Sequence, residues 1–244
     1  MSGRVVLVTG GSRGVGLGIV RAFAAAGAHV VTCGRSAAES EVRYHRADVR
    51  DPAQVDGLVS AVVEEFGRLD VVVNNAGGAP PAQAATASPR LHAKIIELNL
   101  VAPLHVSQRA NAVMQEQESG GAIVMVGSVA GTRPSPGTAA YGAAKAGLAN
   151  LAASLAVEWA PRVRVNTVVV GPVDTELSHL HYGDADGVAA VGSTIPMGRM
   201  ATPADVAQAC LYLAAPSYVT GSTLTVHGGG ERPAFLAASN AVPS

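Results

Sequence analysis

The stretch Val5–Gly16, which reads VVLVTGGSRGVG, decides the fold. Its first four residues form a short apolar run, rich in valine, of the kind found in strands buried in a parallel sheet. A glycine-rich turn follows, and then an apolar stretch of helical character from Leu17 to Ala26. Glycines permit a tight turn, and the start of a helix offers free N–H groups to an anion. The order of strand, turn and helix predicts a loop that binds the phosphates of a dinucleotide, with an ordinary glycine-rich turn as the alternative.

The same alternation of strand and helix continues to residue 226. Further strands are predicted at 29–33, 43–47, 69–73, 122–126, 163–170 and 222–226. Helices are predicted at 52–66, 91–117, 141–159 and 203–215, whereas 36–41 is expected to be a loop or a truncated helix and 176–201 to be irregular. This pattern predicts a single-domain, Rossmann-like α/β fold, a doubly wound parallel sheet of about seven strands with helices on both faces. We expect residues 1–230 to form this dinucleotide-binding and catalytic domain, and 231–244 to be a tail that is either disordered or an arm onto a neighbour.

The composition suggests that identical subunits associate. Charged residues make up 14% of the 244-residue chain and hydrophobic residues 48%, whereas about 25% charged is usual for soluble domains. The helix expected at 141–159 is apolar or small on most of its faces, and one sheet covers only one of them. We therefore expect a homo-oligomer, either a dimer or a tetramer.

Several classes of partner are disfavoured. The formal net charge is −1 and no run of Lys or Arg occurs, so neither nucleic acid nor an anionic membrane is expected to bind. No apolar run reaches the ~20 residues that span a bilayer, and no signal peptide precedes the first strand. Cys33 and Cys210 are isolated and are expected to be reduced and buried. His179 and His181 have no nearby carboxylate cluster, so exposed or lid positions are expected rather than a metal site. These features indicate a cytoplasmic protein.

Chemistry-bearing residues follow the predicted strands. In parallel α/β sheets, ligands bind at the carboxyl ends of the strands. The residues just after successive strands are therefore expected to meet at one edge of the sheet: the Gly10 loop, Arg35, Asp48, Asn75, Ser128 and Thr175.

The end of the second strand bears on the choice of cofactor. It reads Gly34-Arg35 and carries no carboxylate. An acid at this place accepts a hydrogen bond from the ribose 2′-hydroxyl of NAD, whereas a basic residue suits the 2′-phosphate of NADP. Arg13 in the glycine loop is placed to reach the same phosphate. The pair favours NADP over NAD, and two solvated surface arginines are the alternative.

Tyr141 and Lys145 are four residues apart, which places them on one face of a helix. A phenol exchanges protons poorly near neutral pH because its unperturbed pKa is ~10, and an ammonium beside it lowers that pKa. Such a pair is common by chance, so its surroundings must decide. Asn99 precedes Pro103 by four residues, and because proline lacks an N–H the carbonyl of Asn99 loses its helical partner. From spacing alone, a functional acceptor and an incidental bend are equally supported.

Taken together, these residues resemble the short-chain dehydrogenase/reductase family, and within it the 3-oxoacyl reductases and hydroxysteroid dehydrogenases. The resemblance runs from about Gly3 to Gly230. It rests on Thr9-Gly10 with Gly14 and Gly16, Asp48, Asn74–Gly77, Asn99, Ser128, and Tyr141 with Lys145. The chain departs from the family at Gly171-Pro172, where Pro-Gly is usual, and at His227, where Asp is usual.

The resemblance implies a role for each catalytic position. Tyr141 would exchange a proton with the substrate oxygen, and Lys145 would lower the pKa of Tyr141 and bind the nicotinamide ribose. Ser128 would orient the substrate carbonyl, so that Ser128 and Tyr141 are also the substrate-binding residues. Asn99 would hold a water that links Lys145 to solvent.

The resemblance also implies the cofactor-binding set. These residues are Gly10, Ser12, Arg13, Gly14, Val15, Gly16, Arg35, Asp48, Val49, Asn75, Ala76, Gly77, Tyr141, Lys145, Val173 and Thr175.

The function implied is an NADP(H)-dependent oxidoreductase that interconverts a ketone and a secondary alcohol. The segment 176–197 supplies apolar residues at the expected mouth of the site, which indicates a hydrophobic substrate such as an acyl chain or a ring system. One alternative is an NAD-linked alcohol dehydrogenase. Another is a catalytically idle dinucleotide-binding sensor or interaction subunit, against which the intact set of Ser128, Tyr141 and Lys145 argues.

Overall fold

The computed structural model describes residues 1–37 and 39–234, and it contains a seven-stranded sheet in the order β3-β2-β1-β4-β5-β6-β7. Every neighbouring pair of strands is parallel. The strands are β1 (Val5–Thr9), β2 (His29–Gly34), β3 (Arg43–Arg46), β4 (Val71–Asn74), β5 (Gly121–Ser128), β6 (Val163–Val170) and β7 (Thr223–Val226). The strand order reverses direction between β1 and β4, which is where ligands bind in sheets of this kind. From residue 235 on, the predicted tail lies outside the described residues.

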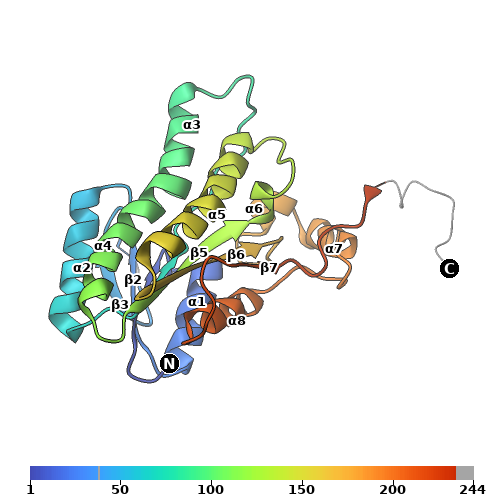
Figure 1. Ribbon diagram of the computed structural model, residues 1–244. Helices are drawn as coiled ribbons and strands as arrows, with labels where there is room; N and C mark the ends of the chain where they lie inside the picture. Colours follow the sequence, from blue (N-terminus) through green and yellow to red (C-terminus); the bar gives the residue numbers. More distant parts are fainter. Residues whose placement is uncertain (38, 235–244) are drawn as a thin grey trace.

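Helices cover both faces of the sheet (Figure 1). On one face lie α2 (Pro52–Phe66), α4 (Ala102–Glu116) and α5 (Ala139–Trp159), and on the other lie α1 (Gly14–Ala25) and α8 (Pro203–Ala214). Along β1, Val5 and Leu7 pack into the core beneath α2 and α4, whereas Val6 and Val8 pack into the core beneath α1 and α8. Because both faces are covered, every residue of β1 is buried, which explains why this strand reads as a continuous apolar run. The predicted fold class is confirmed.

The connection from β2 to β3 contains no helix among its described residues, as the short spacing suggested. The prediction of an irregular segment at 176–201 was wrong, because two helices form there: α6 (His179–Tyr182) and α7 (Ala185–Thr194). Gly183, with a φ of 82°, separates them, and the side chain of Asp184 caps α7 by accepting from the N–H of Gly187 at 3.0 Å. The cap was present in the sequence, but the small residues of α7 gave no clear apolar period.

The long helix expected at 91–117 is divided into α3 (Pro89–Ile96), a π-helical turn over Glu97–Val101, and α4. The N–H of Ala102 donates to the carbonyl of Glu97, five residues back, so the helix widens by one residue at this turn. Such π-turns often mark functional positions. Asn99, which lies within the turn, is completely buried.

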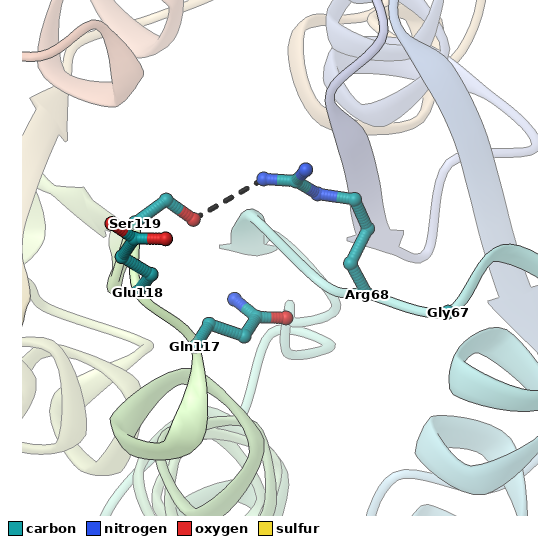
Figure 2. A pocket seen from close by; sticks show the side chains of 5 residues that line it. All are labelled: Gly67, Arg68, Gln117, Glu118 and Ser119. Carbon is teal, nitrogen blue, oxygen red and sulfur yellow. Dashed lines mark hydrogen bonds between the residues drawn. The ribbon is translucent and has the colours of Figure 1, made fainter.

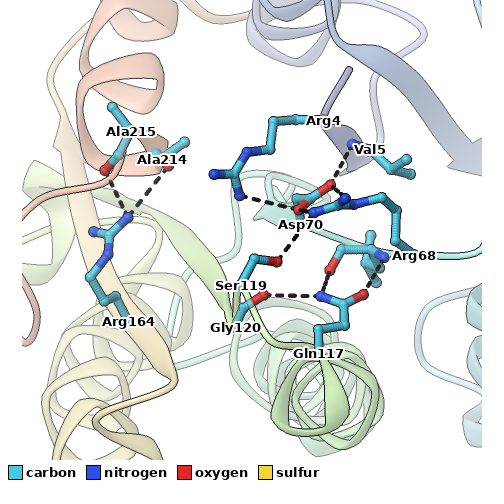
Figure 3. Close-up of polar contacts among 11 residues, drawn as sticks. Arg4, Val5, Arg68, Asp70, Gln117, Ser119, Gly120, Arg164, Ala214 and Ala215 are labelled. Atoms are coloured by element: carbon cyan, nitrogen blue, oxygen red, sulfur yellow. Dashed lines mark hydrogen bonds and ion pairs between the residues drawn. The ribbon is translucent and has the colours of Figure 1, made fainter. Parts of the chain in front are cut away.

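The amino ends of the strands are held by a buried carboxylate, Asp70, which immediately precedes β4 (Figure 3). It accepts hydrogen bonds from the N–H of Val5 at 2.9 Å, from Arg4 at 3.1 Å and from Arg68 at 2.8 Å. Arg68 also donates to Ser119, in the turn before β5, at 3.2 Å. Asp70 therefore links the starts of β1, β4 and β5.

A guanidinium plays the equivalent part at the C-terminal end of α8 (Figure 3). Arg164, on β6, donates to the carbonyls of Leu213 at 3.0 Å and Ala215 at 2.8 Å. The last carbonyls of a helix have no partners within it and carry its negative dipole end, so a cation is stabilising there. Burial lowers the pKa of Arg164, which nevertheless stays charged.

We expect Asp70→Asn to lower the free energy of unfolding by about 1.5–3 kcal/mol, the range for hydrogen bonds to a charged group. The control is Asp56→Asn, because the side chain of Asp56 is 66% exposed and lies 3.5 Å from Arg109, which predicts a loss below about 1 kcal/mol. Urea unfolding followed by the fluorescence of Trp159, the chain's single tryptophan, measures both losses. Equal losses in the two variants would show that Asp70 does not clamp the sheet.

Candidate active site

The glycine loop between β1 and α1 is packed so closely that a side chain does not fit at its centre. A Cβ on Gly16 would lie 2.2 Å from the carbonyl oxygen of Gly10 and 2.5 Å from the side-chain nitrogen of Asn75. Gly14 has a φ of 54°, a conformation that favours glycine. The side chain of Arg13 does not cap α1, and the first turn of this helix contains no acidic residue. The loop thus presents helix N–H groups at the carboxyl edge of the sheet, as a phosphate-binding loop requires.

The residues after β4 join this loop to the rest of the edge. The side-chain amide of Asn75 donates to the carbonyls of Thr9 and Gly10, both at 3.0 Å. The hydroxyl of Thr9 in turn accepts from the N–H groups of Asn75 at 3.1 Å and Ala76 at 3.0 Å. The amide of Asn75 is therefore engaged with the protein itself, and its side chain fixes the position of the glycine loop.

The carboxyl ends of β2 and β3 bring basic residues together. Gly34 is in register with Arg46, and the Nε of Arg46 donates to the carbonyl of Arg35 at 3.0 Å. Arg13, Arg35 and Arg46 are exposed, and among the described residues none of them forms an ion pair. These exposed guanidinium groups, which have no ion-pair partner among the described residues, could bind a phosphate at this edge of the sheet.

Asp48 and Val49 follow β3. The carboxylate of Asp48 accepts from the Nε of Arg50 at 3.0 Å, and this hydrogen bond holds the pKa of Asp48 below its ordinary value. Val49 is buried. Asp48 therefore stays ionised and forms an ion pair with Arg50.

The segment after β6 leaves the sheet edge and returns to it, and its two ends pair with each other. Val173 and Ala201 form an isolated parallel bridge, in which the N–H of Asp174 donates to Ala201 at 2.8 Å and the N–H of Ala201 donates to Pro172 at 3.0 Å. A methyl carbon of Thr175 lies 3.8 Å from where a Cβ on Gly14 would be. The predicted residues Val173 and Thr175 thus stand beside the glycine loop.

The predicted catalytic residues Ser128, Tyr141 and Lys145 come together at the end of β5. Lys145 is 5% exposed, and its Nζ donates to the carbonyl of Val126 at 2.8 Å. The same nitrogen lies 5.7 Å from the centre of the Tyr141 ring. Ser128 ends β5, and its hydroxyl accepts from the N–H of Ala130 at 3.2 Å.

Burial shifts the pKa values of Lys145 and Tyr141 in opposite directions, and the expected lowering of the Tyr141 pKa by Lys145 is outweighed by burial. Burial lowers the pKa of Lys145 to about 8. Burial also raises the pKa of Tyr141, whereas a hydrogen bond with Ser128 lowers it. Burial is the largest cause for both groups, so the pKa of the amine and that of the phenol are set mainly by their removal from water rather than by each other.

Asn99 is bound to the backbone next to Gly77, close to the amine of Lys145. Its amide nitrogen donates to the carbonyls of Gly78 and Ile95, both at 2.9 Å, and its amide oxygen accepts from the N–H of Gly78 at 2.8 Å. A Cβ on Gly77 would lie 2.7 Å from that oxygen and 3.4 Å from the Nζ of Lys145. The absence of a side chain at Gly77 therefore lets Asn99 and Lys145 approach the same backbone.

The mouth of the site is framed by residues that are far apart in the sequence. The phenol of Tyr182, in α6, is near enough to raise the pKa of Tyr141 further. Burial raises the pKa of Tyr182 itself, while Arg133 lowers it and Glu231 raises it. Arg133 and Glu231 form an ion pair across the mouth. His179 and His181 are exposed on α6.

Sequence reasoning missed Arg46 and Arg50, and it placed Glu176 and Tyr182 only in the substrate-side segment, without their contacts to the glycine loop and to Tyr141. The proximity of Arg46 follows from the register of β2 and β3, and that of Tyr182 from the placement of α6. Neither is encoded in a local motif. Glu176, whose carboxylate accepts from the N–H of Gly14 at 2.8 Å, depends on a contact between residues 162 positions apart.

Other features of the described residues lie away from this edge. A cavity of about 600 Å³, lined by Gly67, Arg68, Gln117, Glu118 and Ser119, opens near the start of β5, whereas Ser128 ends that strand (Figure 2). Within residues 1–37 and 39–234, no group of three or more His, Cys, Asp or Glu is arranged to hold a metal ion. In the same part of the chain, no helix has the length and apolar character needed to cross a membrane.

Comparison with known proteins agrees with this geometry. The family model described as enoyl-(acyl carrier protein) reductase matches residues 10–231. The chain is 35% identical to 3-oxoacyl-[acyl-carrier-protein] reductase of Chlamydia muridarum, over 93% of this chain and 96% of that protein. It is also 35% identical to 3beta-hydroxysteroid dehydrogenase 1 of Eggerthella lenta, with 94% of each covered.

A solved structure adds the cofactor of a relative. The structure of ElxO with NADP bound superimposes with a TM-score of 0.85 at 29% identity, covering 94% of this chain and 98% of that one. Together with the fold and the grouping of Ser128, Tyr141 and Lys145, these matches show that the chain belongs to the short-chain dehydrogenase/reductase family and is an NAD(P)-dependent oxidoreductase that acts on CH–OH and C=O groups.

Proposed function

We propose that the protein is an NADP(H)-dependent oxidoreductase that interconverts a hydrophobic ketone and its secondary alcohol. The observation that carries this proposal is the buried amine of Lys145, which lies 5.7 Å from the ring of Tyr141, beside a Ser128 hydroxyl that lowers the pKa of Tyr141. Burying the ammonium of Lys145 costs desolvation free energy, and a dinucleotide-binding subunit without catalytic activity would gain nothing from it.

In the direction of reduction, Tyr141 donates its proton to the oxygen of the substrate carbonyl. Ser128 holds that oxygen by a hydrogen bond and thereby aligns it with the phenol. Lys145, in its ammonium form, stabilises the phenolate that remains. The bound nicotinamide supplies the hydride for the carbonyl carbon and accepts one in the reverse direction.

The proton then has to be replaced. In this proposal, Asn99 holds a water that passes protons from solvent to Lys145. The π-helical turn and the space left by Gly77 support this role, because they bring a buried polar residue close to the amine.

The preference for NADP(H) rests on Arg13, Arg35 and Arg46. Guanidinium groups bind phosphate oxygens by paired, charge-assisted hydrogen bonds. The end of β2 carries no acid that would select the 2′-hydroxyl of NAD. Arg46 is added to the pair that the sequence suggested, because its hydrogen bond to the carbonyl of Arg35 places it beside Arg35. The other proposed cofactor contacts are those named from the sequence, with Asn75 acting through the glycine loop.

The hydrophobic substrate is inferred from the surface near the mouth. Leu180 is 65% exposed and Met197 is 67% exposed, and both belong to the segment between β6 and α8. Exposed apolar side chains around a polar site are typical of a surface that binds an apolar ligand. An acyl chain and a ring system both fit this description.

The expected homo-oligomer and cytoplasmic location belong to the same proposal. Val157, on α5, is 81% exposed, which is costly unless a second copy covers it. Burial raises the pKa of Cys33 to about 11 and that of Cys210 to about 12, so both thiols are unreactive. These features fit a reduced, oligomeric enzyme in the cytoplasm.

We expect Tyr141→Phe to lower kcat for reduction of apolar ketones by about 10²–10⁴-fold, because the general acid is lost. The Kd for NADPH should rise by about tenfold at most, because only one hydrogen bond to the cofactor is lost. Tyr218→Phe is the matched control, because Tyr218 is fully exposed and its hydroxyl takes no part in the site. Full activity of Tyr141→Phe with tight cofactor binding would reject this site as the catalytic centre.

The chain's only lysines are Lys94 and Lys145, so the titration of the buried amine is directly measurable. With lysine labelled by ¹³C at Cε, NMR of the cofactor-free protein should show one signal that titrates near pH 8, since burial disfavours the ammonium. Lys94→Arg removes the other signal and completes the assignment. A midpoint near the unperturbed ~10.4 would mean that Lys145 is solvated.

Replacing both Arg35 and Arg46 by Ala should weaken NADPH binding by about tenfold or more and leave NADH binding within about twofold, because only NADPH carries the 2′-phosphate. Arg90→Ala, which removes an exposed charge from α3, is the control. Fluorescence titration of the reduced nicotinamide gives both constants. Turnover of the wild-type enzyme with NADH that equals or exceeds that with NADPH would overturn the cofactor assignment.

A further inference from the structure

The N-terminal end of α1 is stabilised by an acid from a distant part of the chain. The N–H of Gly14 donates to a carboxylate oxygen of Glu176 at 2.8 Å, across 162 residues of sequence. Some helices use a residue at their own start, as Asp51 caps α2, Ser88 caps α3 and Thr202 caps α8, whereas α5 and α6 have no side-chain cap. In α1 the residue at this place is Arg13, whose side chain forms no cap.

This end of α1 has the chemistry of an anion site. Helix N–H groups and the positive end of the helix dipole favour a negative group, such as a carboxylate or a phosphate. The other glycines of the loop pack against the protein, whereas a Cβ on Gly14 would meet nothing nearer than a methyl carbon of Thr175 at 3.8 Å, so the N–H of Gly14 is open to such a group. In the free protein the anion that occupies this position is the carboxylate of Glu176.

Glu176 belongs to a hydrogen-bonded turn that leads into α6, at the mouth of the site. The hydroxyl of Ser178 accepts from the N–H of Thr175 at 2.8 Å and donates to the carbonyl of Val173 at 3.3 Å. Helix α6, with Tyr182 at its end, begins immediately after Ser178. Only two residues, both within this turn, separate Glu176 from the first residue of α6.

We propose that Glu176 competes in cis with the cofactor pyrophosphate for the N–H of Gly14, and that its displacement shifts α6 at the substrate mouth. The inference rests on the proposed binding of a dinucleotide at the glycine loop. Two anionic groups cannot share one N–H in close contact, because their charges repel each other. Glu176 therefore lowers the affinity for the cofactor and couples the phosphate site to Tyr182.

The first experiment measures the affinity for NADPH by nicotinamide fluorescence. Glu176→Gln and Glu176→Ala should bind NADPH about two- to fivefold more tightly than the wild type, as expected for one charge at a helix N-terminus. The gain should shrink as salt is added, because exposed charges are screened. Asp174→Asn removes the same charge two residues away without touching Gly14, and should leave the affinity unchanged.

The second experiment follows α6 itself and needs no turnover. Leu180→Cys introduces an exposed thiol, whereas Cys33 is 1% exposed and Cys210 is completely buried, so an environment-sensitive fluorophore labels residue 180 selectively. Both NADPH and inorganic pyrophosphate should change its emission in the Leu180→Cys protein. In the Glu176→Ala background the emission should start near the bound value and change little.

The results separate this inference from the proposed function. If neither NADPH nor NADH binds to any variant, the dinucleotide site itself fails. If NADPH binds but the Glu176 variants bind equally or more weakly than the wild type, Glu176 is not a competitor. If Asp174→Asn raises the affinity for NADPH as much as the Glu176 variants do, the gain comes from the net charge and not from the contact with Gly14. If pyrophosphate leaves the emission of the label at residue 180 unchanged, displacement of Glu176 does not shift α6.

Discussion

The structure depends on keeping one amine, that of Lys145, out of water beside a phenol. Burial disfavours the ammonium, so the site needs oxygen atoms placed in advance to hold it. The carbonyl of Val126 does so from within β5, at 2.8 Å. The position of α5 on the sheet, the end of β5 and the bare backbone at Gly77 all have to agree for that contact to form.

The amino ends of the strands carry structural hydrogen bonds, whereas the carboxyl ends carry the candidate active site. At the amino ends, Asp70 and Arg164 join strands and helix termini through hydrogen bonds that are largely removed from solvent. At the carboxyl ends, Thr9, Asn75 and Asn99 use their side chains to fix loops rather than to contact solvent. Chemistry at one edge thus rests on a framework secured at the other, which is the preorganisation that catalysis needs.

Much of this arrangement was predictable from the sequence, and the limit has a physical cause. Strands, glycine turns and the convergence of Ser128, Tyr141 and Lys145 follow from local patterns, because a parallel sheet places every strand end at one edge. The π-helical turn at Asn99 was foreseen only as a bend, since proline spacing does not specify how a helix widens. The helices α6 and α7, the proximity of Arg46 and the contact of Glu176 depend on register and long-range packing, which no short motif encodes.

The bridge between Val173 and Ala201 has an evolutionary consequence. Because the hydrogen bonds of Asp174 and Ala201 close the base of the segment that contains α6 and α7, both of its ends are tied to the sheet edge. Insertions or exchanges within that excursion do not alter the spacing of its anchors, so they leave the strands undisturbed. The segment can therefore diverge to suit a new ligand while the strands keep their places, although a change at Tyr182 would also alter the surroundings of Tyr141.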